Sequence, residues 1–198
     1  MRLLLIAEDA HAVRSVLAQL PRGGAGVQLR APGLPAGELL ARARALREIC
    51  DAFAAPLLIN DRLDVALAAR ADGVHLPSRG VAPQDARALF TRAGREALIG
   101  VSCHSIADVE KASREGADYA VFGPIWDVPG KGAAVGVEAL RAAVRAAPLS
   151  LFALGGVTAH NAHEAIAAGA RGVACVRFVF DAHDPPAAAI ALWQAVTA

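Results

Sequence analysis

The sequence has few aromatic residues, few cysteines, no excess of either charge and no long hydrophobic run. Aromatic residues make up only 5% of the 198 residues although 55% are hydrophobic, so the core must consist mainly of Ala, Val, Leu and Ile. Such a core is typical of buried parallel strands covered by alanine-rich helices. The high hydrophobic fraction also argues against a disordered chain.

Cysteine usage and the first residues indicate the cellular setting. Cys50, Cys103 and Cys175 are an odd number without Cys-x-x-Cys spacing, which argues against a disulfide framework or a structural zinc site. We therefore expect buried, reduced thiols. The apolar run at residues 3–7 ends before Glu8 and is too short for a secretion signal or a membrane span. A cytoplasmic location without a membrane partner is the expectation.

Charge is nearly balanced, with 20 Lys and Arg against 19 Asp and Glu. No overall field draws such a chain toward DNA, RNA or an anionic membrane. We therefore expect a small-molecule partner and no nucleic acid. A homodimer is the expectation from base rates alone.

Short apolar runs alternate with longer stretches of helical period along the whole chain. Eight such pairs, no Gly-x-Gly-x-x-Gly after the first run, and polar residues after nearly every run favour a closed barrel over an open sheet. The sequence therefore predicts an α/β fold, a (β/α)₈ TIM barrel forming one domain over residues 1–198. The predicted strands are Leu3–Ala7, Gly26–Leu29, Pro56–Ile59, Gly73–Leu76, Leu98–Val101, Tyr119–Phe122, Ser150–Ala153 and Gly172–Val176.

Three junctions between a helix and the next strand resemble one another, at residues 70–74, 116–120 and 169–173. Their spacing corresponds to about two βα units. We interpret Gly116 and Gly169 as residues that end a helix with a left-handed backbone, and not as functional residues.

Active sites of such barrels form from the loops that follow the strands. After the seventh strand, Gly155 and Gly156 allow backbone N–H groups to approach an anion closely, and Thr158 is a predicted N-cap of the next helix. Together with the loop after the eighth strand, which contains Arg177, they form a predicted phosphate site. The alternative is a tight turn without a ligand.

Polar residues follow the third, fourth and fifth strands as well. Asn60 and Asp61 offer an amide and a carboxylate for Mg²⁺ or a heterocycle, although Asp61 is equally suited to capping the next helix. His75 and His104 end neighbouring strands and are candidate catalytic acids or bases, with His104 placed beside Ser102. For each histidine the alternative is a structural role.

The longest loop runs over residues 123–136 and is rich in glycine and proline. Loops of this length are usually lids or binding elements. Lys131 within it is a candidate contact for an anionic substrate, and the alternative is a solvated lysine on a flexible loop.

The order of several motifs resembles the thiamine phosphate synthase and thiazole tautomerase family. This resemblance implies a barrel that binds a thiazole phosphate. A synthase joins that thiazole to a pyrimidine diphosphate, releases pyrophosphate and uses Mg²⁺, whereas a tautomerase moves a proton on a thiazole phosphate carboxylate and needs no cofactor. The motifs are residues 58–66 (LINDRLDVA), 71–77 (ADGVHLP), 100–105 (GVSCHS), 116–119 (GADY), 123–124 (GP) and 154–157 (LGGV).

The resemblance also implies roles for single residues. By the synthase pattern, Gln28 and Arg30 bind the pyrimidine diphosphate, Ser102 contacts the diphosphate, and Asp61 is a metal ligand. This metal role applies only to a synthase.

Residues 76–78 (LPS) resemble the tautomerase branch, and two departures from the synthase pattern count against a synthase. Pro32 replaces an expected lysine, and residues 78–80 replace a stretch with a metal-binding carboxylate. The sequence-based hypothesis is therefore a thiazole tautomerase with His104 as general acid or base, although Pro124 stands where that branch has a histidine. The alternatives are a Mg²⁺-dependent synthase, a non-catalytic barrel that binds a phosphorylated ligand, and another phosphate-binding barrel enzyme.

Overall fold

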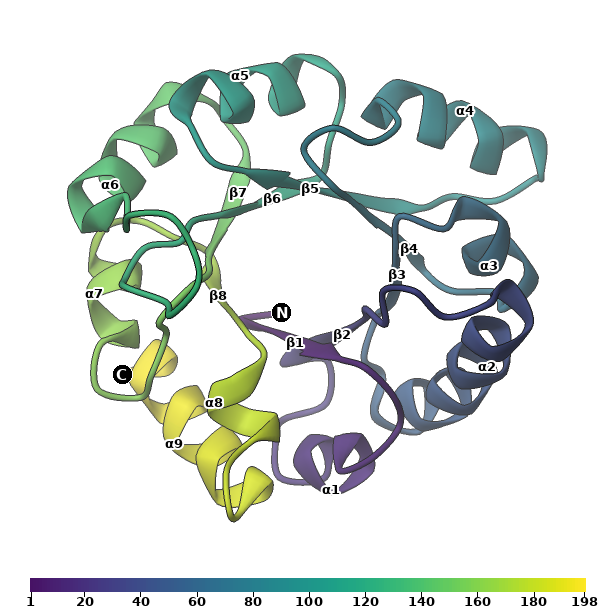
Figure 1. Cartoon of the computed structure of the whole chain (residues 1–198), viewed down its shortest axis with the longest axis horizontal. Helices are drawn as coiled ribbons and strands as arrows, with labels where there is room; N and C mark the ends of the chain where they lie inside the picture. Colours follow the sequence, from purple (N-terminus) through teal and green to yellow (C-terminus); the bar gives the residue numbers. More distant parts are fainter.

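The computed structural model describes residues 1–198 as a closed barrel of eight parallel strands inside a ring of helices (Figure 1). Each strand pairs with its neighbours in chain order, and the last strand closes onto the first with Leu3 opposite Val173. The predicted α/β barrel is confirmed. The strands are β1 (Leu3–Ala7), β2 (Ala25–Leu29), β3 (Leu57–Asn60), β4 (Gly73–Leu76), β5 (Leu98–Cys103), β6 (Tyr119–Phe122), β7 (Ser150–Ala153) and β8 (Gly172–Cys175).

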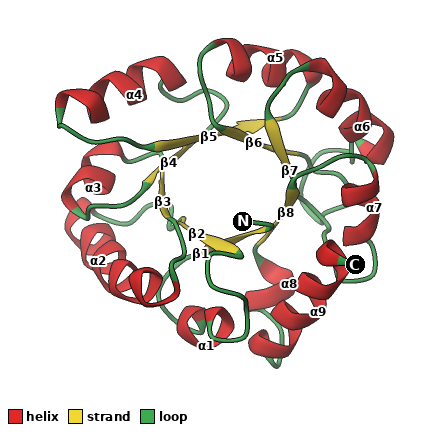
Figure 2. Ribbon diagram, turned by 180° about the vertical axis from the view of Figure 1, so that it is seen from behind, coloured by secondary structure: helices red, strands yellow, loops and turns green.

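The helices lie outside the strands on every side, as Figure 2 shows from behind. Two helices follow the last strand, because Val176 leaves the extended conformation with φ −116° and ψ −81° and the chain turns at once into a short helix. The helices are α1 (Val13–Leu17), α2 (Ala36–Phe53), α3 (Leu63–Ala68), α4 (Pro83–Arg92), α5 (Ile106–Arg114), α6 (Gly136–Ala146), α7 (Ala162–Ala167), α8 (Arg177–Phe180) and α9 (Pro185–Thr197).

Four strands differ from prediction by one or two residues at their ends. β3 begins at Leu57 because Pro56 has no N–H to donate to a ladder. β5 continues to Cys103, which pairs with Phe122 of β6. β2 begins one residue early, and β8 ends one residue early, at Cys175.

Strand side chains alternate between two cores. The larger core has 49 buried residues between the strands and the helices. The smaller core fills the inside of the barrel, so the barrel is not a pore. Its seven buried residues are Leu4, Ile6, Leu58, Tyr119, Val121, Phe152 and Ala174.

The cysteines are buried and unpaired, as predicted. Burial raises the pKa of each of the three thiols, Cys50, Cys103 and Cys175, to about 12. They therefore stay protonated at neutral pH and contribute to the core as small hydrophobic groups.

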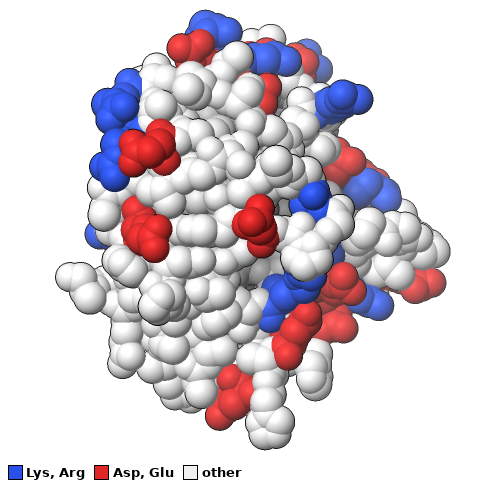
Figure 3. Space-filling model, turned by 60° about the vertical axis from the view of Figure 1, so that its left-hand side comes forward, with Lys and Arg blue, Asp and Glu red and all other residues white.

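Charged side chains of both signs are scattered over the face in Figure 3, with broad uncharged areas between them. This distribution agrees with the balanced composition and shows no basic stripe on that face. None of the helices has the length and apolar character needed to cross a bilayer.

The two glycines at the helix ends adopt the predicted left-handed conformation. Gly116 follows α5 with φ 81°, and Gly169 follows α7 with φ 98°. Arg70 occupies the equivalent place after α3 with φ 55°. Of the three similar junctions, this one alone has a residue with a side chain in the left-handed conformation.

Two of these junctions also contain a carboxylate that ties a helix to two strands. The carboxylate of Asp72 accepts hydrogen bonds from the N–H of Leu57 at 2.6 Å and from Arg47 of α2 at 2.5 Å. Two βα units later, Asp118 accepts from the N–H of Ile99 at 2.6 Å and from Arg87 of α4 at 2.8 Å. Each carboxylate therefore satisfies a backbone donor at the start of a strand and pairs with an arginine.

Replacing Asp118 by alanine should destabilise the fold by about 2 kcal/mol, since it leaves a backbone N–H and a guanidinium without their shared acceptor. Urea unfolding at neutral pH measures this loss. Glu110→Ala is the control, because it removes an exposed carboxylate of α5. Equal unfolding midpoints for the two variants would contradict the assignment.

Candidate functional site

Four polar side chains that the sequence singled out lie at the carboxyl ends of β2 to β5. Alternation along each strand gives Gln28, Asn60, His75 and Ser102 the same inward direction. Asn60 stands opposite His75 in the pairing of β3 with β4. The structure thus brings four of the predicted site residues together at one end of the barrel.

Gln28 and Asn60 form one pair in this group. Gln28 is only 2% exposed, and its amide nitrogen donates to Oδ1 of Asn60 at 3.0 Å. Its Oε1 is buried and has no hydrogen-bond partner. Buried acceptors without a partner are rare in folded proteins, so this oxygen keeps an unused capacity to accept a hydrogen bond.

His75 lies deeper and uses both ring nitrogens. Its Nδ1 hydrogen-bonds to the Tyr119 hydroxyl at 3.0 Å and its Nε2 to the Ser102 hydroxyl at 2.9 Å. Burial, assisted by the positive charge of Arg30, lowers the pKa of His75 from 6.5 to about 3. A neutral ring with both nitrogens engaged favours a positioning role over the predicted acid–base role.

Acid should destabilise the protein through His75. Between pH 6.5 and about 3 the unfolded chain binds a proton that the folded protein does not. The contribution of the neutral His75 to the free energy of unfolding is therefore fully present above pH 6.5. It falls by about 1.4 kcal/mol per pH unit as the pH drops through that window. Urea titrations from about pH 7 to pH 4.5 measure the slope. His75→Gln should flatten it, whereas substitution of the exposed His163 should not; equal slopes in all three proteins would contradict the assignment.

His104 is exposed just beyond β5 and differs from His75 in its surroundings. Its Nδ1 donates to the carbonyl of Gly123 at 2.7 Å, because a carbonyl only accepts. Its backbone N–H donates to the carboxylate of Asp108 at 2.9 Å. Nε2 is consequently the nitrogen left to accept a proton, but no hydrogen bond joins His104 to His75 or Ser102.

Asp61 follows β3 in a left-handed conformation with φ 63°. Its N–H donates to the carbonyl of His75 at 2.9 Å, and its exposed side chain has no partner. The capping alternative fails, since α3 begins at Leu63 without any side-chain cap. Non-glycine residues in this region cluster at functional sites because their strain needs support from the surroundings.

Gly155 and Gly156 are also left-handed, with φ 95° and 64°. A side chain at Gly155 would lie 2.6 Å from Cα of Pro124, and one at Gly156 would lie 2.7 Å from Cβ of Trp126. The loop between β6 and α6 therefore packs directly on both glycines. We call Gly155 and Gly156, with this loop behind them, the glycine corner.

The start of α7 differs from prediction. The helix begins at Ala162, so Thr158 is not its N-cap. Thr158 belongs to a turn in which Asn161 accepts from the Thr158 N–H at 2.8 Å and donates to the carbonyl of Gly156 at 3.0 Å. The side chain of Asn161 thus holds the glycine corner from its other side.

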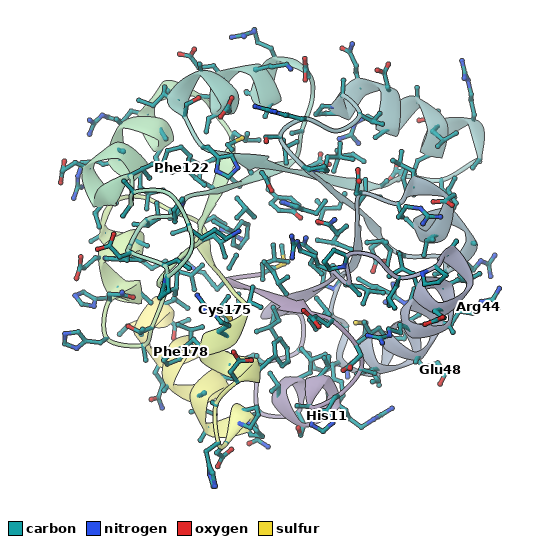
Figure 4. All side chains as sticks on the ribbon, viewed as in Figure 1. His11, Arg44, Glu48, Phe122, Cys175 and Phe178 are labelled. Atoms are coloured by element: carbon teal, nitrogen blue, oxygen red, sulfur yellow. The ribbon has the colours of Figure 1, made fainter.

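The three remaining cationic candidates are exposed. Arg30 follows β2, Lys131 lies on the loop between β6 and α6, and Arg177 is the first residue of α8. Phe178, which follows Arg177, packs on the outer core beside α9 and away from the centre of the ring (Figure 4). Its ring therefore does not cover the barrel mouth.

Almost the whole chain matches one protein family. The model of the thiamine monophosphate synthase family covers residues 3–179. The chain belongs to this family.

Relatives of the chain in this family are named as synthases. A "Putative thiamine-phosphate synthase" of Geobacter sulfurreducens is 44% identical over 96% of this chain and 92% of its own length. The thiamine-phosphate synthase of Moorella thermoacetica is 39% identical over 90% of this chain and 85% of its own. The thiamine-phosphate synthase of Methanoculleus marisnigri is 42% identical over 89% of this chain and 84% of its own length.

One solved structure agrees with the family assignment, and a second shows the shared fold. A thiamine phosphate pyrophosphorylase from Pyrococcus furiosus superimposes with a TM-score of 0.87 at 29% identity, over 98% of this chain and 95% of that one. A 3-hexulose-6-phosphate synthase reaches a TM-score of 0.72 at 18% identity, over 98% of this chain and 99% of that one, and shows the shared fold alone.

One residue of the site in this thiamine monophosphate synthase family member was not predicted. Tyr119 starts β6, is 2% exposed and contacts His75 from inside the barrel. The available signal was the strand alternation that places Tyr119 on the inward face, together with Gly100 opposite it. From the sequence, Tyr119 was recognised as the start of a strand and as part of the motif at residues 116–119, but not as a site residue.

Proposed function

We propose that this chain is a thiamine phosphate synthase, which joins a pyrimidine diphosphate to a thiazole phosphate. The names of its relatives support this branch over the tautomerase that the sequence favoured.

The observation that most supports the synthase is the unpartnered Oε1 of Gln28. The pyrimidine ring of thiamine has an amino group, which can donate to this buried oxygen. Asn60, already bonded to Gln28, fixes the direction of the amide. A thiazole phosphate alone offers no comparable donor, so a tautomerase would leave this oxygen unsatisfied.

The diphosphate then lies above the pyrimidine, toward Arg30 and Ser102. Arg30 supplies positive charge at the mouth, as its effect on the pKa of His75 indicates. In the reaction the bond from the pyrimidine methylene carbon to the diphosphate oxygen breaks. A bond from that carbon to the thiazole nitrogen forms, and pyrophosphate leaves with the electron pair. Groups that stabilise the departing negative charge accelerate such a step.

The phosphate of the thiazole binds at the glycine corner. Gly155 and Gly156 have no side chains, and two exposed cations lie on neighbouring segments, Lys131 on the loop between β6 and α6 and Arg177 at the start of α8. Barrels of this type commonly bind phosphate after β7 and β8. This assignment leaves the thiazole nitrogen free to face the pyrimidine.

Asp61 would hold the Mg²⁺ that a synthase uses. No group of three or more His, Cys, Asp or Glu side chains forms a metal cluster in this structure. Mg²⁺ is often held by one or two carboxylates plus substrate phosphates, so Asp61 fits an ion that arrives with the diphosphate. The bound ion would supply positive charge to the leaving group.

Pyrophosphate release measured with both substrates and Mg²⁺ tests the proposal, with thiazole tautomerisation assayed in parallel. We expect release only when both substrates are present. In thermal-shift titrations, Mg²⁺ alone should not stabilise the protein, whereas Mg²⁺ with the pyrimidine diphosphate should. Tautomerisation without pyrophosphate release would overturn the proposal, and binding without either reaction would favour a non-catalytic barrel.

A further inference from the structure

Three side chains from neighbouring strands form a hydrogen-bonded row across the barrel interior. Tyr119 of β6 contacts Nδ1 of His75 on β4 at 3.0 Å, and Nε2 of His75 contacts Ser102 of β5 at 2.9 Å. Tyr119 and His75 are each 2% exposed, while Ser102 is half-buried at the mouth. The row therefore leads from the closed interior to the opening.

Tyr119 is held in place from several sides. Its ring meets Phe152 edge-on at a centroid distance of 5.6 Å and an angle of 82°. The His75 ring lies at the same centroid distance, tilted by 36°. A side chain at Gly100 would overlap the Tyr119 ring, so this glycine provides the space that the phenol occupies.

The direction of each hydrogen bond follows from the hydrogens available. Burial raises the pKa of Tyr119, so its hydroxyl keeps a proton. Nδ1 of His75 is the one acceptor that the hydroxyl reaches, and a buried hydroxyl without an acceptor would be costly. Tyr119 therefore donates to Nδ1.

The rest of the row is then determined. A neutral imidazole has one N–H, so with Nδ1 accepting, the hydrogen sits on Nε2 and is donated to the Ser102 oxygen. The hydroxyl hydrogen of Ser102 consequently cannot point to His75 and turns toward the mouth. In a nucleophilic serine the polarity is opposite, since the histidine accepts the serine proton.

We propose that Tyr119 and His75 are positioning residues that make Ser102 a hydrogen-bond donor to an anionic oxygen of the substrate. This inference rests on the proposed function, in which that oxygen belongs to the departing diphosphate. The low pKa of His75 agrees with it, because a protonated ring would donate to both neighbours. Ser102 stabilises the leaving group and forms no covalent intermediate.

Nitrogen NMR of the whole protein, labelled with ¹⁵N-histidine and free of substrate, tests the tautomer. We expect His75 to show an unprotonated Nδ1 and a protonated Nε2 at neutral pH. Comparison with His75→Gln assigns the signals. A proton on Nδ1 would overturn the inference even if synthase activity is found. Absence of synthase activity with the expected tautomer would overturn the proposed function and, with it, the diphosphate as the recipient of the Ser102 hydrogen bond.

Kinetics of Tyr119→Phe give the second test. Without the phenol, nothing fixes the tautomer, so we expect kcat to fall about 10-fold with little change in KM, because leaving-group charge develops only in the transition state. The double variant Tyr119→Phe/Ser102→Ala should have a kcat only slightly lower than that of Tyr119→Phe alone. If the loss of kcat in the double variant equals the product of the losses in the two single variants, Tyr119 does not act through Ser102 and the inference is overturned.

A conservative substitution separates positioning from packing. His75→Gln keeps an N–H near the place of Nε2, whereas His75→Leu keeps only the volume. We expect the glutamine variant to retain several-fold more kcat than the leucine variant. Equal kcat values in two variants that both fold by circular dichroism would overturn the role of His75.

Discussion

Asp61→Asn is expected to lower kcat/KM for pyrophosphate release by about 10²- to 10³-fold, because in the proposed synthase it removes the carboxylate that would hold the cation on the leaving group. Asparagine is the suitable replacement, since it tolerates the left-handed backbone with φ 63° that Asp61 adopts. The urea midpoint should therefore stay unchanged. Steady-state kinetics over a range of Mg²⁺ concentrations measure the effect, and a higher Mg²⁺ requirement should accompany the loss.

Asp64→Asn is the matched control for this experiment. Asp64 is an exposed carboxylate three residues further on, engaged with Arg62 through two hydrogen bonds of 2.9 and 2.6 Å. Its loss should change kcat/KM by less than about 3-fold, as expected for a surface ion pair. Similar activities for the two variants would show that Asp61 has no special role.

Gly155→Ala should lower kcat/KM for the thiazole phosphate by about 10²-fold and destabilise the fold as well. The added carbon would lie 2.6 Å from Cα of Pro124, so the loop between β6 and α6 would have to move off the glycine corner. Displacing a binding group by about 1 Å is enough for such a loss. Kinetics at varied thiazole phosphate, with urea unfolding in parallel, separate the two effects.

Gly94→Ala is the control that measures the loss of stability from placing a side chain on a left-handed backbone without a steric clash. Gly94 also has a positive φ, 68°, but an added carbon there would meet no atom within 4 Å. It should cost about 1 kcal/mol of stability and leave the kinetics unchanged. If Gly155→Ala behaves like Gly94→Ala, the corner does not depend on close packing.

The architecture was predictable because it rests on local periodicity. Every predicted strand overlaps an observed strand, since buried parallel strands are continuous apolar runs and their helices follow a different period. Alternation within a strand also predicts which side chains enter the barrel mouth, as for Gln28 and Ser102. Strand ends were less accurate, because pairing with the neighbouring strand decides them, as for Cys103.

The roles of the site residues depend on contacts between distant segments and could not be predicted. Tyr119 is 44 residues from His75 in sequence, yet the two side chains form a hydrogen bond inside the barrel, where burial lowers the pKa of His75 and keeps its ring neutral. The glycines at 155 and 156 were assigned to phosphate binding alone, while the structure shows that the loop behind them needs the same space. Asp61 was considered a cap, and only the backbone geometry removes that alternative.

The choice between the two branches of the family was the weakest inference. It rested on the resemblance of residues 76–78 to the tautomerase branch and on replaced residues such as Pro32 and Gly80, whose neighbours in space the sequence does not give. The curated relatives favour the synthase in spite of these replacements. In the proposed synthase a single carboxylate, Asp61, would be sufficient, because the substrate itself would supply oxygen ligands to the cation.

The filled interior of the barrel restricts how ligands enter and leave the site. Phe152, Tyr119 and Leu58 block the axis below the polar residues, so the lower end offers no exit. In the proposed synthase reaction, two substrates and two products would all have to pass through one opening. The molecule that binds nearer the axis must bind before its partner and dissociate after it. The shape of the barrel alone therefore imposes an order of binding and release.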